Sequence, residues 1–166
     1  VYSKMQKTFA GELKFLKIFL FVVFLFAYQG ATTVAALPPL LGIFFTYLIY
    51  LNLRREKRLL VNEYELYFCI FYLIFIEQTH GFALFSSLLG CIFFYYFMFD
   101  YLSVTLKSRV LLIGSFTIYA YLFTFAASLL LGYAGDFQTP GFDYETAIYA
   151  AIEAVIAIIL FKERFA

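Results

Sequence analysis

Charged side chains are scarce in this chain, and their scarcity indicates the class of protein. Only 14% of the 166 residues are Asp, Glu, Lys or Arg, whereas 64% are hydrophobic. Soluble domains are about 25% charged, so this composition would leave extensive apolar surface facing water. The sequence therefore predicts an integral membrane protein. We expect residues 1–166 to form a single membrane domain, because the length suits one helical bundle.

Other shortages argue against several kinds of site. The net charge of +1 gives no electrostatic basis for binding nucleic acid. The one histidine, His80, argues against a haem site, since haem in membrane subunits is usually held by paired histidines. The two cysteines, Cys69 and Cys91, lie in apolar runs at a spacing that matches no metal or redox motif. We interpret them as packing residues.

Catalytic groups are also missing from the pattern. The acids in or near apolar runs form no recognisable pair, and Ser86 and Ser87 have no base close in sequence. Glu77 and His80 could share a helix face, but two ligands are too few for a metal site. We therefore expect a protein that is not an enzyme and has no catalytic residue, cofactor or metal.

Six apolar runs indicate the membrane spans. Most have about the 20 residues that a helix needs to cross a bilayer, and none alternates as a barrel strand would. We expect an all-α, polytopic membrane bundle of about six transmembrane helices at 15–36, 38–53, 60–77, 81–99, 110–132 and 144–161.

The basic residues all fall on one side of these six spans. The other three connections, 29–37, 77–81 and 133–143, contain no Lys or Arg. The positive-inside rule then predicts that both termini are cytoplasmic. The 12 basic residues are Lys4, Lys7, Lys14, Lys17, Arg54, Arg55, Lys57, Arg58, Lys107, Arg109, Lys162 and Arg164.

The stretch EQTHG, residues 77–81, interrupts apolar sequence between the third and fourth spans. Gly81 suits the end of a helix, and Gln78 and Thr79 can hydrogen-bond to backbone groups freed at the break. We interpret Glu77, His80 and Gly81 as a structural turn. The last outer connection, 132–146, is rich in Gly, Pro and acid, which predicts an external loop.

Glu153 lies near the middle of the last apolar run, where a charged carboxylate costs about 2.5–3.5 kcal/mol on insertion scales. Ala147, Ala150, Ala154 and Ala157 surround it at helical spacing and form a face suited to close packing. We expect Glu153 to be protonated or hydrogen-bonded against a neighbouring helix or another subunit. A proton or substrate site is the alternative. Interhelical hydrogen bonds in membranes average ~0.6 kcal/mol, so Glu153→Leu should weaken assembly only modestly, and Glu153→Gln should preserve packing.

The order of these features resembles the rod shape-determining protein MreD family. "LPPLLGIFFTYLIYLNL" (37–53) is similar to the family's proline-led span, and "RREKR" (54–58) to the loop after it. "EQTHGFALFSSLLGCIFFYYF" (77–97) resembles its acid-to-glycine turn and the next helix. Glu77 stands where the family usually has Asp, His80 where it has a small residue, and Ser87 near a frequent polar position.

This resemblance implies a non-enzymatic scaffold of the cell-elongation complex in the bacterial inner membrane. Its expected partners are an MreC-like membrane protein and, through the MreB-linked assembly, RodA with its penicillin-binding synthase. Two alternatives remain open. One is the substrate-binding membrane component of a vitamin-type transporter, with a pocket at Glu153 and the outer loop. The other is an accessory subunit of a respiratory or motor complex.

Overall fold

The computed structural model of the chain describes residues 2–57, 59–135 and 140–164, with side chains from residue 15 onward. These residues form seven α-helices and no strand, which confirms the all-α prediction. The chain divides into two compact units, 1–37 and 38–166.

The first unit consists of α1, Tyr2–Thr32, and the residues that follow it. Its second half, Phe15–Thr32, is apolar and long enough to cross a membrane. The helix ends at a pair of threonines. Thr32 Oγ1 donates to the carbonyl of Gln29, and Thr33 Oγ1 donates to that of Gly30, each at 2.7 Å. These hydroxyls donate hydrogen bonds to backbone carbonyls that have no N–H partner at the end of a helix.

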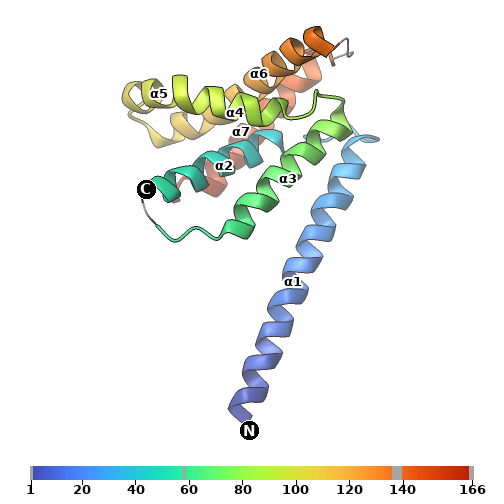
Figure 1. The fold of residues 1–166 in the computed structure, drawn as a ribbon, viewed down its shortest axis with the longest axis vertical. Helices are drawn as coiled ribbons and strands as arrows, with labels where there is room; N and C mark the ends of the chain where they lie inside the picture. Colours follow the sequence, from blue (N-terminus) through green and yellow to red (C-terminus); the bar gives the residue numbers. More distant parts are fainter. Residues whose placement is uncertain (1, 58, 136–139, 165–166) are drawn as a thin grey trace. The chain divides into compact units, whose positions relative to one another are not determined.

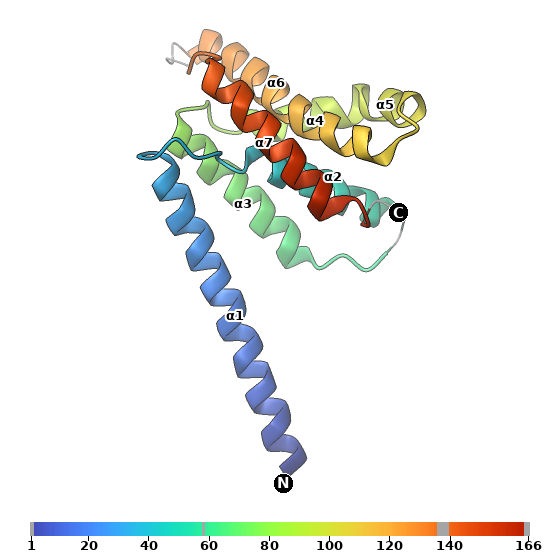
Figure 2. The same cartoon turned by 180° about the vertical axis from the view of Figure 1, so that it is seen from behind.

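The second unit is a bundle built around one helix, α2. Its elements are α2 (Leu41–Glu56), α3 (Glu63–His80), α4 (Ser86–Phe97), α5 (Phe99–Thr105), α6 (Arg109–Gly135) and α7 (Tyr144–Phe161). Helix α2 packs against α3, α4, α6 and α7, and α6 also packs against α4 and α7 (Figures 1 and 2). The start and end of α2 are therefore both within reach of residues from other helices.

The two views agree on which ends of this unit lie together (Figures 1 and 2). The ends of α2 and α7 and the connection from α5 to α6 lie at one end. The turn from α3 to α4, the end of α6 and the start of α7 lie at the other. The segments at the first end include the described basic residues of this unit. Which side of a membrane this end faces stays a prediction.

The helices differ in their capacity to cross a bilayer. By length and composition α6, α7 and the second half of α1 can each span a membrane, and α4 with α5 would make a fourth span. The bent pair meets at Met98 at an angle of 54°. Helix α2 has only 16 residues, and α3 carries three glutamates. The described residues thus contain three or four candidate spans of a multi-pass membrane protein.

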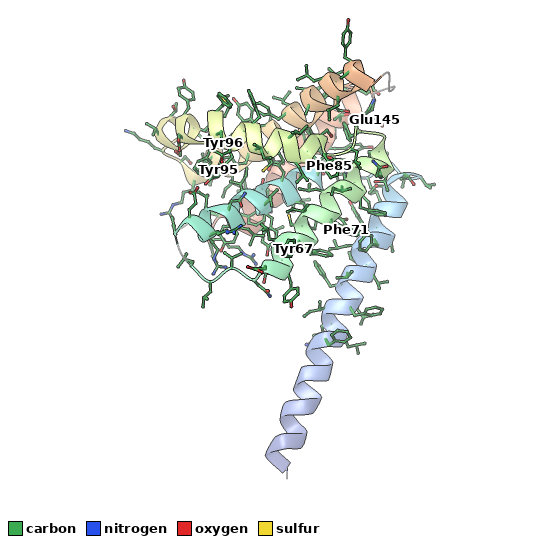
Figure 3. All side chains as sticks on the ribbon, viewed as in Figure 1. Tyr67, Phe71, Phe85, Tyr95, Tyr96 and Glu145 are labelled. Carbon is green, nitrogen blue, oxygen red and sulfur yellow. The ribbon has the colours of Figure 1, made fainter. Side chains whose placement is uncertain are left out.

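Large apolar and aromatic side chains cover the outside of the bundle as well as its core. Tyr67 and Phe71 on α3 and Tyr96 on α4 are all more than half exposed (Figure 3). Inside, Phe94 packs edge-on against Phe45 and Phe116, with ring centres 5.9 and 5.6 Å apart. A bundle that is apolar both inside and outside is what a lipid environment selects.

Candidate functional site

The start of α2 is held by a carboxylate from the last helix of the chain. Glu153, in the middle of α7, is fully buried. Its Oε1 accepts from the backbone N–H of Leu40 at 2.7 Å, and its Oε2 accepts from those of Gly42 at 2.7 Å and Ile43 at 3.3 Å. Helix starts leave their first N–H groups without partners, and Glu153 supplies the acceptors.

A tyrosine completes the hydrogen bonding of this carboxylate. The hydroxyl of Tyr121, on α6, donates to Oε1 of Glu153 at 2.6 Å. Each oxygen therefore accepts two hydrogen bonds, and all four donors point at it, which is the pattern of a carboxylate acceptor. A negative group also interacts favourably with the positive end of the helix dipole. The geometry joins α2, α6 and α7 at one buried point.

Local sequence explains why α2 needs an acceptor from elsewhere. Pro38 and Pro39 disfavour helix immediately before them and donate no N–H. Leu40 then adopts the left-handed conformation, with φ 64° and ψ 15°, and makes no side-chain cap. No Ser, Thr, Asp or Asn stands at the cap position, where such residues usually satisfy the first N–H groups. The acceptor comes from a residue more than 100 positions later in the chain.

Close approach at this point depends on Gly42. A Cβ on Gly42 would lie 2.3 Å from Cγ2 of Thr117 on α6 and 3.0 Å from Oε2 of Glu153. Thr117 has little freedom to move, since its hydroxyl lies 3.4 Å from that of Thr46 and donates to the carbonyl of Ile113. Only glycine allows α2 to bring its N–H groups to the carboxylate.

A second buried glutamate does the same for α4. Glu77, near the end of α3, is fully buried. Its Oε2 accepts from the N–H of Phe85 at 2.7 Å. Its Oε1 accepts from the N–H of Ser87 and, at 3.3 Å, from the hydroxyl of Ser86. The acid of the 77–81 stretch is therefore the cap of the next helix.

The two caps share one geometry. Phe85 precedes α4 in the left-handed conformation, with φ 67° and ψ 10°, just as Leu40 precedes α2. In both, the left-handed residue donates to one carboxylate oxygen and the residue two positions later donates to the other. These two are the non-glycine residues with positive φ in the described chain. A left-handed leucine or phenylalanine is costly, and the paired hydrogen bonds hold it in place.

The remaining residues of the turn have separate positions. Gly81 ends α3 in the left-handed conformation, with φ 73°. His80 is half-buried at the last position of α3. Thr79 bonds to the carbonyls of Phe75 and Ile76, within its own helix. Ser87 is buried, and its Oγ has no hydrogen-bond partner among the described residues.

The alanines of the last helix divide between two environments. Ala150, Ala154 and Ala157 are buried with Glu153, whereas Ala147, near the start of α7, is exposed. The buried side of α7 packs on α2 and α6 of the same chain, and Ala157 lies in one cluster with Ile113 and Phe161. Packing within the chain thus occupies this face. Its use by a partner stays a prediction.

Aromatic and basic side chains gather at the other end of α2. The Arg54 guanidinium lies 5.7 Å from the ring centre of Tyr50, and that of Arg164 lies 6.0 Å from Phe161. Tyr47 stacks on Phe161 with ring centres 6.0 Å apart. Tyrosine and arginine at one level are typical of a membrane–water interface.

Sequence reasoning found both acids but missed what they bind. The acceptor role could have been inferred from the lack of a capping residue at two helix starts. The helices that begin at residues 41 and 86 are preceded by Leu and Phe, which cannot cap a helix with their side chains. A buried helix start without a local cap requires an acceptor from another part of the chain. The two buried glutamates, Glu77 and Glu153, are the acceptors for these two helix starts. In the described chain no group of three or more His, Cys, Asp or Glu could hold a metal ion.

Comparison with known proteins adds no relative. No family model, no curated protein and no solved structure matches the chain.

Proposed function

We propose that this chain is a non-enzymatic scaffold subunit of the bacterial cell-elongation complex. It crosses the inner membrane six times, with both termini in the cytoplasm. It binds an MreC-like membrane protein and, through it, joins the assembly of RodA and its penicillin-binding synthase. The partners follow from the resemblance of residues 38–97 to the MreD family, and the geometry of the glutamates supports the scaffold role.

The observation that carries the proposal is the double glutamate cap. Glu77 and Glu153 are the fully buried acids of the described chain, and each has both carboxylate oxygens occupied by donors at a helix start. An acid held in this way fixes the relative positions of helices. Groups that rigidify a bundle suit a protein whose work is to present fixed surfaces to partners.

The outer faces of the bundle offer such surfaces. Helix α4 exposes Ile92, Phe93 and Phe97, and α7 exposes Val155 and Ile159. In a bilayer, apolar faces of this kind contact either lipid or the helices of another protein. Both faces remain after all packing within the second unit is complete, so either can receive a partner's helix.

The proposed topology predicts the sidedness of single cysteines. Lys57→Cys and Lys107→Cys should react with a membrane-impermeant maleimide only from the cytoplasmic side, and Glu145→Cys only from the opposite side. Background labelling should be low, because Cys69 and Cys91 are buried. All three replaced residues are exposed. Reaction of Glu145→Cys and Lys57→Cys from the same side would contradict the six-span arrangement.

Partner capture tests the assignment to the elongation complex. We expect the tagged chain, purified from its native membranes in a mild detergent, to retain an MreC-like protein, RodA and a penicillin-binding synthase. Mass spectrometry of the eluate identifies the partners. The matched control is an unrelated multi-pass protein carrying the same tag. Retention of redox or motor subunits in place of this set would favour the accessory-subunit alternative and contradict the proposal.

The transporter alternative is favoured by one observation, a cavity of about 560 Å³ in the second unit. This volume lies in the range of small-molecule sites. The cavity does not include Glu153, whose hydrogen-bonding capacity is taken up by the start of α2. A transporter component should therefore retain a water-soluble ligand and an ATPase partner through purification, whereas the scaffold should retain neither.

A further inference from the structure

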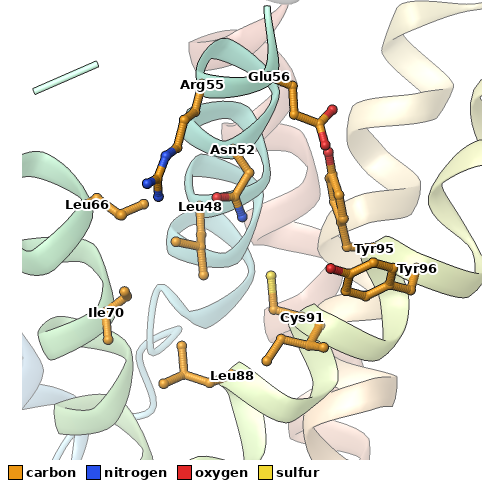
Figure 4. Close-up of a pocket in the computed structure, with 11 residues that line it drawn as sticks. Leu48, Asn52, Arg55, Glu56, Leu66, Ile70, Leu88, Cys91, Tyr95 and Tyr96 are labelled. Carbon is orange, nitrogen blue, oxygen red and sulfur yellow. The ribbon is translucent and has the colours of Figure 1, made fainter. Parts of the chain in front are cut away.

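The cavity lies where α3 and α4 separate. The two helices are joined by the short turn at 81–85 and diverge away from it, and α2 packs against both (Figures 1 and 2). The residues at its base, Leu48 on α2 and Cys91 on α4, are buried. Leu66, Ile70 and Leu88 line its walls (Figure 4). The deep part of the cavity is therefore apolar.

Its mouth is polar and carries both signs of charge. Asn52, Arg55 and Glu56 come from the last turns of α2, and Tyr95 and Tyr96 from α4. Figure 4 shows Arg55 on the side of Leu66 and α3, and Glu56 on the opposite side beside Tyr95. The hydroxyl end of Tyr95 lies next to the carboxylate of Glu56 (Figure 4). Cationic and anionic groups thus stand on opposite sides of one opening.

Two of these polar groups are available to a ligand. Within the described part of the chain, the guanidinium of Arg55 and the side-chain amide of Asn52 make no hydrogen bond or ion pair. Guanidinium groups bind phosphate oxygens through two parallel hydrogen bonds. An amide NH₂ adds further donors. Arg55 and Asn52, three positions apart on α2, thus bring donors suited to phosphate to the edge of an apolar cavity.

The mouth lies at the level expected for a lipid headgroup. Arg55 and Glu56 end α2, at the end of the bundle where Arg54 stacks on Tyr50 and Arg164 on Phe161. The rim is open, since Ile92 and Tyr96 are 56% and 77% exposed. A molecule in the bilayer can reach the cavity through this rim without crossing the bundle.

We propose that this cavity binds one membrane phospholipid with an amine-bearing headgroup. An acyl chain lies between α3 and α4, against Leu48, Ile70 and Leu88. The phosphate binds Arg55 and Asn52, and the ammonium group lies toward Glu56 and the faces of the tyrosines, which attract cations. A headgroup that carries only the phosphate charge would leave the Glu56 carboxylate without a cationic partner, so the mixed mouth favours the zwitterion.

The test compares lipids and two adjacent arginines. The full chain is purified in mild detergent, and palmitoyl-oleoyl phosphatidylethanolamine or the matching phosphatidylglycerol is added. Bound lipid is then measured by native mass spectrometry. Arg55→Gln removes the phosphate contact, and Arg54→Gln is the matched control, because it makes the same charge change at a residue that does not line the cavity. Thermal unfolding establishes that both variants are folded.

We expect one phosphatidylethanolamine per chain, retained in preference to phosphatidylglycerol. Loss of one charge-assisted contact should weaken binding about tenfold in Arg55→Gln and leave Arg54→Gln unchanged. Ile70→Trp, which fills the apolar wall, should also reduce occupancy. Equal loss in both arginine variants, equal or tighter binding of phosphatidylglycerol, or binding of glycerophosphoethanolamine without acyl chains would each overturn the proposal. So would the absence of a retained lipid.

Discussion

Replacing Glu153 with leucine should destabilise the bundle far more than the loss of one interhelical contact would. Three backbone N–H groups and the Tyr121 hydroxyl lose their acceptor in a buried site. Each buried donor left unsatisfied costs about 1–3 kcal/mol, and whole proteins are stable by only about 5–15 kcal/mol. We expect the leucine variant to be poorly folded. The measurement is the midpoint of unfolding in detergent, followed by circular dichroism.

Glutamine at this position should restore only part of the stability. An amide has one acceptor oxygen, and its NH₂ group must face donors that the second carboxylate oxygen now satisfies. Tyr121→Phe removes one donor and leaves the three backbone contacts intact, so it should be the mildest of the three. Glu145→Gln, an exposed change on the same helix, is the control. A leucine variant within about 1 kcal/mol of the wild type would contradict the cap's importance.

This ordering changes what the glutamine variant can reveal about function. From the sequence alone, Glu153→Leu should weaken assembly only modestly and Glu153→Gln should preserve packing. The four donors to the carboxylate change both expectations. In the structure both carboxylate oxygens are acceptors, so glutamine disturbs packing whatever the protein does. Activity of the glutamine variant is therefore informative only when its folding has been measured first.

Gly42→Ala is the second substitution with a large expected effect. The new methyl would lie 2.3 Å from Cγ2 of Thr117, so α2 must move away from α6 and from Glu153. Overpacking of a core typically costs about 1–3 kcal/mol, and the displaced N–H groups add to this cost. We expect a lower unfolding midpoint and less protein extracted in folded form.

Two further variants show whether the methyl group is the cause. Thr117→Ser removes Cγ2 and keeps the hydroxyl, so it should recover most of the lost stability when combined with Gly42→Ala. Gly114→Ala on α6 is the control, because its Cβ would meet only Cδ1 of Ile158 at an ordinary 3.5 Å. Alanine is also the better helix former. Failure of Thr117→Ser to rescue would show that the clash with the Thr117 methyl group is not what destabilises the protein.

The sequence predicted the helices better than their contacts. The last apolar run, 144–161, coincides with α7, and the run at 60–77 overlaps α3, Glu63–His80. The length and periodicity of an apolar run are local properties, so a single sequence is enough to predict helices from them. The run at 81–99 conceals a turn and the break at Met98, because all of its residues are apolar enough to belong to one helix. Of the external loop predicted at 132–146, residues 132–135 belong to the end of α6 and residues 144–146 to the start of α7. Residues 136–139 lie outside those that the structure describes.

For the candidate site, the sequence indicated which residues are unusual but not what they contact. Glu153 and its neighbouring alanines attract notice in the sequence because an acid in an apolar helix is rare. Its acceptor role at Leu40 and Gly42 could not be read there, since no local pattern links residues 111 and 113 positions apart. The importance of Gly42 depends on Thr117 for the same reason. Pairings between distant helices are set by three-dimensional packing, which one sequence does not display.

The long separation between α2 and its cap has a consequence for the order in which this protein can be assembled. Helix α2 is synthesised before α7, so its first N–H groups find their acceptor only when α7 has been made. Contacts between distant parts of a chain form late, because the intervening chain must be ordered first. The cap of α4 needs only the preceding helix, since Glu77 and Phe85 are eight positions apart in the sequence. The pair α3–α4 can therefore form during synthesis, whereas the first N–H groups of α2 lack their acceptor until α7 has been synthesised.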